Sequence, residues 1–166
     1  MKTPAHIALG VLTFFWTAVF CISISAATPR LQEKLGTQEL SILQNPKFVT
    51  ILPMVCEPDL ANFPPIKEVF LSRDETEKLK TNILDDHNYD FERVKKCRFF
   101  PEISFKFEDN EGRVVHLFVS PLCRQMLFRT EVGSLLINYD PAHERIDFFL
   151  KQLIDETRMR NEIKGR

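Results

Sequence analysis

The chain has no surplus of either charge and few glycines, and each shortage excludes a class of protein. Its 166 residues hold 22 Lys and Arg against 23 Asp and Glu, so it lacks the basic excess of a nucleic-acid-binding protein. Five glycines leave no Gly-rich phosphate loop, and neither Gly-x-Ser-x-Gly nor His-Glu-x-x-His occurs. We therefore expect no nucleic-acid partner, and no motif indicates a catalytic residue, a cofactor or a metal site.

Charged side chains are also missing between Lys2 and Arg30, and this gap predicts export. A basic residue, an apolar run over residues 7–27 and small residues at its end have the layout of a secretory signal peptide. The small residues at the end of the run would allow cleavage before Thr28. We therefore expect residues 1–27 to be a signal peptide.

An uncleaved membrane anchor is the alternative for the same residues. The apolar run of about 20 residues is long for a signal peptide and is enough to cross ~30 Å of hydrocarbon. In that case the protein would contact the membrane through residues 7–27. Both interpretations place the rest of the chain outside the cytoplasm, in the periplasm or at the extracytoplasmic face of the membrane.

The abundant residues predict a folded domain after this segment. Hydrophobic residues make up 44% of the chain and include 15 phenylalanines, a composition that excludes global disorder. A chain of this length usually forms one domain with its own core. We expect residues 28–46 to be a spacer or short helix, residues 47–158 an α+β domain, and residues 159–166 a flexible tail.

The clearest local pattern is a β-hairpin. Apolar residues alternate with others in both of its arms: Ile103, Phe105 and Phe107, then Val115, Leu117 and Val119. Asp109-Asn-Glu-Gly112 between the arms suits a type I turn closed by a glycine with positive φ. This turn pairs Asp109 with Arg113 and therefore Phe105 with Leu117. That register places all six apolar side chains on one face, as a half-buried sheet requires.

Further strands and two helices complete the expected fold. Strand patterns cover residues 47–53, 66–71, 126–129 and 135–139. Ser72 and Glu75 form a capping box that begins a helix ending near Leu84. Asp140 as N-cap and Pro141 at the first helical position begin a last helix. Its apolar stripe consists of Ile146, Phe149, Leu150, Leu153 and Ile154.

The fold class is therefore α+β. We expect a mostly antiparallel sheet of four to six strands with the C-terminal helix packed on it, preceded by a signal or transmembrane helix. His116 and Phe118 face away from the core in the hairpin register, so either a second helix covers that face or an apolar patch is exposed for a partner. We expect coverage.

The phenylalanines have two interpretations as a group. They could line an apolar ligand pocket, but we expect them to form the core that covers one sheet face. The residues concerned are Phe99, Phe100, Phe105, Phe107, Phe118, Phe128, Phe148 and Phe149.

Two of the three cysteines after residue 27 are candidates for a disulfide. Outside the cytoplasm a neighbouring pair is expected to be oxidised. In the hairpin register Cys97 and Cys123 are diagonal neighbours, about 7–8 Å apart, slightly beyond the usual disulfide limit of ~6.8 Å. Pro101 and Pro121 interrupt the ladder there, so a bulge could close the gap. We predict a Cys97–Cys123 disulfide, with two free buried thiols as the alternative and Cys56 left over.

The same stretch carries a recognisable pattern. Cys97-Arg-Phe-Phe-Pro101, a strand from Ile103, a second strand over residues 114–119 and Cys123 form a Cys-Pro turn, a β-hairpin and a closing Cys. The pattern resembles a group of small exported bacterial proteins of unassigned function, with a similar strand and helix order upstream. It departs from them at Glu102-Ile103, where they have Arg-His, and in lacking their second closing Cys. The resemblance implies export and this fold, and no activity.

Three polar clusters could carry chemistry, and for each we expect a structural role instead. Asp85, Asp86, His87 and Asp90 could bind a divalent cation, but they lack the Gly and Glu of an EF-hand loop. Cys123 with a histidine would make a nucleophile and base, although His116 points to the opposite face and only tertiary packing could bring His143 close. The last cluster is Asp140, His143 and Glu144, where capping already accounts for the aspartate.

The function that this sequence favours is non-enzymatic. We expect an exported or membrane-tethered small domain with a binding or structural role in the cell envelope, acting on a protein or small ligand. The alternative is an envelope enzyme, either a thiol–disulfide enzyme or a metal-assisted hydrolase. A membrane-tethered assembly factor is a third possibility if the N-terminal segment is retained.

Overall fold

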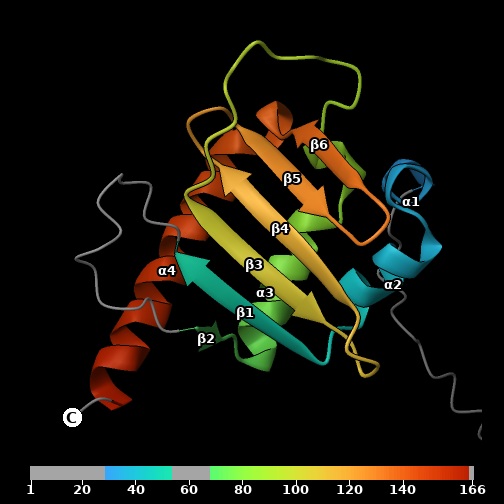
Figure 1. The fold of residues 1–166 in the computed structure, drawn as a ribbon. Coiled ribbons are helices and arrows are strands. Elements are labelled where there is room, and N and C mark those ends of the chain that lie inside the picture. The colour runs from blue at the N-terminus through green and yellow to red at the C-terminus, as the bar shows by residue number, and fades with distance from the viewer. Residues whose placement is uncertain (1–28, 54–67, 165–166) are drawn as a thin grey trace, which may run out of the picture.

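The computed structural model describes residues 29–53 and 68–164 and has an α+β fold (Figure 1). In this part of the chain six antiparallel strands form one sheet in the order β2-β1-β3-β4-β5-β6. The strands are β1 (Phe48–Pro53), β2 (Val69–Phe70), β3 (Ile103–Glu108), β4 (Val114–Ser120), β5 (Gln125–Arg129) and β6 (Ser134–Asn138). The helices are α1 (Pro29–Leu35), α2 (Thr37–Gln44), α3 (Arg73–Ile83) and α4 (His143–Lys164), with 3-10 turns η2 (Asp86–Asn88) and η3 (Asp140–Ala142).

The β3–β4 hairpin has the predicted register. Phe105 pairs with Leu117, and Gly112 closes the turn with φ 78°, a left-handed conformation that glycine adopts without steric cost. The Asp109 carboxylate accepts hydrogen bonds from the backbone N–H groups of Glu111 and Arg113. The predicted strands at residues 47–53, 126–129 and 135–139 are present as β1, β5 and β6, while the 66–71 stretch contributes only the two residues of β2.

The core lies between one face of the sheet and the helices. Figure 1 shows α3 and α4 behind the strands. The sheet contributes Val49, Ile51, Phe105, Phe107, Val115, Leu117, Val119, Met126 and Phe128 to this core, all buried. The predicted capping box begins α3, because the Ser72 N–H donates to Glu75 Oε2 at 2.6 Å and the Glu75 N–H donates to Ser72 Oγ at 3.3 Å. The predicted stripe of α4 packs on the same core.

Residues 29–44 form α1 and α2, separated by Gly36, and belong to the packed domain. Leu31 and Leu43 are fully buried in the main core. The Asp86 carboxylate accepts hydrogen bonds from the backbone N–H groups of Arg30 and Leu31, at 2.9 and 3.0 Å. This carboxylate caps α1 from a distant part of the sequence, so the first helix is fastened to η2.

One helix begins differently from the prediction. Asp140 is not the N-cap of α4, because residues 140–142 form the 3-10 turn η3 and its N-cap, Tyr139, makes no side-chain capping bond. Pro141 does lie in the first turn. At its other end α4 continues to Lys164, past Arg158, where we expected the polar tail to begin.

The predicted signal or anchor at residues 1–27 and the third cysteine, Cys56, lie outside the described residues. Within residues 29–53 and 68–164 no helix is both long and apolar enough to span a membrane.

Candidate functional site

No described helix covers the sheet face opposite the core, where His116 and Phe118 lie half-buried, so the helix that we expected over this face is not among the described helices. We call this face the open face. Large apolar side chains are exposed on it: Phe48 is 45% exposed, Phe70 58% and Leu136 47%. The described helices pack against the other face, so nothing in this part of the chain shields these side chains. Phe48 and Phe70 lie at the β2–β1 edge of the sheet and Leu136 lies on β6 at the other edge, so exposed apolar groups border this face on both sides, as at a binding surface.

Strand register arranges the open face into rows that run across the strands. One row, the apolar row, passes from Leu52 through Ser104, Phe118 and Leu127 to Leu136. Ser104 is buried. The row therefore presents apolar side chains on four of the five strands that it crosses.

The neighbouring row carries three nitrogen bases side by side. It passes from Phe70 through Thr50, Lys106, His116 and Arg129 to Ser134. We call Lys106, His116 and Arg129, on β3, β4 and β5, the basic row. Because directly opposed residues of adjacent antiparallel strands have Cβ atoms about 4.5–5.5 Å apart, these three side chains are immediate neighbours.

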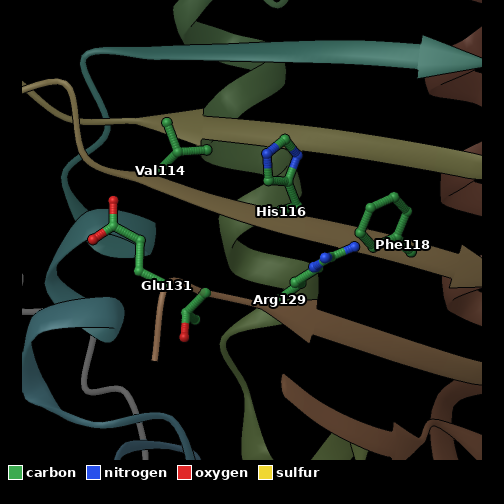
Figure 2. Close-up of a pocket in the computed structure, with 6 residues that line it drawn as sticks. Val114, His116, Phe118, Arg129 and Glu131 are labelled. Atoms are coloured by element: carbon green, nitrogen blue, oxygen red, sulfur yellow. The ribbon is translucent and has the colours of Figure 1, made fainter. Parts of the chain in front are cut away.

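The two rows meet at an open depression of about 410 Å³ lined by Val114, His116, Phe118, Arg129, Thr130 and Glu131. Figure 2 shows His116 and Phe118 projecting from β4, with the Arg129 side chain extending toward Phe118 and Glu131 pointing away from both. The rings of His116 and Phe118 are stacked, with centroids 5.9 Å apart.

The basic row differs in charge from one residue to the next. Lys106 donates to Glu108 in an ion pair at 2.8 Å, and this hydrogen bond raises the pKa of Lys106. Burial lowers the pKa of His116, and the positive charges of Lys106 and Arg129 lower it further. His116 is therefore neutral near pH 7. Arg129 has no ion pair with any described residue.

A third row, at one end of the open face, is covered by the chain itself. Residues 90–100, the cover segment, cross Ser120, Gln125 and Asn138, which pair across β4, β5 and β6. Asn138 Nδ2 donates to the Arg93 carbonyl, and the Phe100 N–H donates to Ser120 Oγ at 3.3 Å. This row is polar because an irregular segment needs hydrogen-bond partners for its backbone groups.

Cys97 and Cys123 lie at disulfide distance, with Cα atoms 5.8 Å apart. Cys97 is in the exposed cover segment and Cys123 is buried in the turn between β4 and β5. The tight β4–β5 turn, in which Arg124 has φ 53°, brings the pair closer than the diagonal spacing that a regular ladder predicts. This pair is compatible with an oxidising compartment outside the cytoplasm.

The acidic residues at 85–90, which we considered as a cation site, form turns and a helix cap. Asp85 accepts hydrogen bonds from His87 through both the backbone N–H and Nδ1. Burial acts to raise the pKa of Asp85, but these bonds and the His87 charge outweigh it and the pKa is lowered. Asp86 caps α1, and Asp90 accepts from the Glu92 and Arg93 N–H groups. Among the described residues no group of three His, Cys, Asp or Glu could hold a metal ion.

The cluster at Asp140 is an ion-pair centre. Lys95 Nζ, from the cover segment, donates to Asp140 Oδ1 at 2.8 Å and to the Cys123 carbonyl at 2.8 Å. Arg124 and Arg93 nitrogens lie 3.9 and 4.0 Å from the same carboxylate. His143 Nδ1 lies 2.9 Å from the Asp140 carbonyl. The arrangement fastens the cover segment to the start of the last helix.

Asp140→Asn should lower the free energy of unfolding by about 1–2 kcal/mol, because the mostly buried Lys95 ammonium would lose its charged partner. The neighbouring exposed substitution Glu144→Gln is the control and should change it by less than ~0.5 kcal/mol. Urea unfolding monitored by circular dichroism measures both. Equal effects of the two substitutions would contradict this assignment.

The candidate residues that sequence reasoning did not identify are Lys106, Leu127, Arg129 and Leu136. The hairpin register already placed Lys106 opposite His116. The sequence does not show which residues of β5 and β6 lie beside these two, because the β4–β5 turn sets the pairing of β4 with β5. It therefore left out Leu127, Arg129 and Leu136.

Comparisons with known proteins add no assignment. No protein family, curated protein or solved structure matches the chain at a significant level. The described residues form an α+β domain with one sheet face that no described helix covers.

Proposed function

We propose that the protein is an exported, disulfide-closed binding domain whose open face holds a protein partner. The observation that carries this proposal is the set of exposed apolar side chains on the open face, on strands that form the framework of the domain. A rigid sheet can present such a surface without reorganisation, which lowers the entropic cost of binding.

Three further points support a binding role outside the cytoplasm. The Cys97–Cys123 pair is suited to an oxidising compartment. The charge-free segment before Arg30 predicts a signal peptide or anchor, and the resemblance to small exported bacterial proteins agrees with export. The polar clusters that could have served catalysis have structural partners instead.

The proposal predicts contact between the open face and a partner in the cell. A photo-crosslinking amino acid at Leu136, in the full-length chain, should give a discrete crosslinked protein product. The same amino acid at Phe148, a 64% exposed position on α4, is the matched control and should give none. If neither Leu136 nor Phe118 gives a product above the Phe148 background, the open face is not a binding surface.

A further inference from the structure

We infer that the partner presents carboxylate side chains next to apolar ones, with the carboxylates on the basic row and the apolar groups on the apolar row. This inference rests on the proposed function and names the chemistry of the partner. It follows from the side-by-side course of the two rows on the open face.

The dimensions of the rows suit a segment of protein. The apolar row crosses five strands, so it is about 19 Å long at ~4.8 Å per strand spacing. The basic row lies two residues farther along each strand, about 7 Å away. Residues i and i+2 of an extended chain are also about 7 Å apart and point to the same side. One extended segment with an apolar residue at i and an acidic residue at i+2 can therefore contact both rows.

The charges of the basic row favour carboxylates on the partner. Glu108 already offsets Lys106, and no described residue offsets Arg129. Arg129 also lies beside His116, where two neighbouring cations disfavour protonation of the ring. A carboxylate placed over this row would pair with Arg129 and at the same time stabilise the protonated form of His116. A cationic partner would instead meet the charges of Lys106 and Arg129, because Glu108 is already paired with Lys106 and the Glu131 side chain points away from the row.

Other occupants fit these rows less well. A second copy docked through the same face would bring the same basic row and no row of carboxylates to pair with it. Small-molecule and acyl-chain sites are concave and enclose most of their ligand, whereas the depression here is open, with Val114, His116, Phe118 and Arg129 on its floor and rim.

Charge reversal tests the inference within the crosslinking experiment. In the full-length chain with the crosslinker at Leu136, Arg129→Glu should reduce the yield of crosslinked product about tenfold or more, as expected when a close charge pair becomes repulsive. Arg129→Gln should give an intermediate loss. Lys151→Glu, the same charge change on exposed α4, is the control and should leave the yield unchanged. Thermal unfolding of each variant checks that the fold is intact.

Mass spectrometry of the product then identifies the contacting segment. The expected segment carries Asp or Glu within a few residues of the crosslinked apolar residue. An undiminished yield with Arg129→Glu, a basic segment, a lipid adduct or a second copy of this chain would overturn the inference and leave the open face as a binding surface. Absence of any product from the open face would overturn both.

Discussion

Replacing Cys97 with Ser should lower the free energy of unfolding by about 3 kcal/mol, because an oxidised Cys97–Cys123 pair closes a loop of about 25 residues in the unfolded chain. Urea unfolding of the oxidised protein, with and without reductant, measures the effect. Reductant should destabilise the native protein to the level of the variant. The double variant Cys97→Ser/Cys123→Ser is the control, and reductant should leave it unchanged.

The same substitution should loosen the cover segment more than the rest of the sheet. The Phe100 and Asp90 N–H groups donate to Ser120 Oγ and the Asn138 carbonyl, and hydrogen exchange at both should become faster. Exchange in the β3–β4 hairpin should change only through the loss of global stability.

This experiment also separates the proposed binding domain from the alternative enzyme. If Cys97→Ser has the same free energy of unfolding as the native protein under oxidising conditions, then Cys97 and Cys123 do not form a disulfide in the native protein. A thiol–disulfide activity that disappears with Cys123→Ser, without loss of stability, would then become the better hypothesis. Loss of stability in both variants supports the structural role.

The features that sequence reasoning predicted depend on local patterns. The hairpin register follows from side-chain alternation and a four-residue turn, so Phe105 and Leu117 could be paired from the sequence alone. The Ser72–Glu75 capping box involves residues three positions apart. The hairpin register also makes Cys97 and Cys123 diagonal neighbours, and the β4–β5 turn then brings them to disulfide distance. These signals act within a few residues or continue one ladder.

The features that could not be predicted depend on tertiary packing. Asp86 resembles a turn residue or metal ligand in the sequence, and only the fold brings it to the start of α1. Asp140 has the residue type and position of an N-cap, but Lys95 reaches it from the cover segment and takes the carboxylate. Local propensity for capping is worth about 1 kcal/mol, so a charged partner from elsewhere can override it.

The open face illustrates the same limit. Alternation places His116 and Phe118 away from the core, but it does not say whether another element covers them. Here the cover segment crosses the polar row of Ser120, Gln125 and Asn138, and no described helix crosses the apolar and basic rows. The polar row can satisfy the backbone groups of an irregular segment, and the apolar row cannot. The residue types of the open face therefore differ between the polar row, which the chain itself covers, and the apolar and basic rows, which we assign to a partner.

Glu75→Ala should lower the free energy of unfolding by about 2–3 kcal/mol, the second large effect that we expect. Glu75 is buried, completes the capping box of α3, and binds Arg160 Nη1 at 2.6 Å. The cap contributes about 1 kcal/mol, and loss of one member of a buried ion pair costs up to ~3–5 kcal/mol, less here because Arg160 is partly exposed. Arg160 also donates to the Phe70 carbonyl, so the pair joins α4, α3 and β2.

A double-mutant cycle isolates the ion pair from the cap. Glu75→Gln keeps a hydrogen-bonding side chain, and Arg160→Met keeps the apolar stem. We expect the two losses to be non-additive by about 1 kcal/mol or more, the mark of residues in direct contact. Additive losses would show that the pair contributes little beyond the separate packing and capping of its members.

The pH dependence gives an independent test with a definite sign. Burial acts to raise the pKa of Glu75, but the hydrogen bonds from Ser72 and the pairing with Arg160 outweigh it, so the pKa is lowered in the folded protein. A carboxyl group with a lowered folded pKa stabilises the protein above the pKa of the unfolded chain, about 4.3, and this stabilisation is lost as the pH falls further. The stability difference between the native protein and Glu75→Gln should therefore be constant near neutral pH and shrink below about pH 4.3. A difference that persists undiminished to low pH would assign the effect of Glu75 to packing instead of charge.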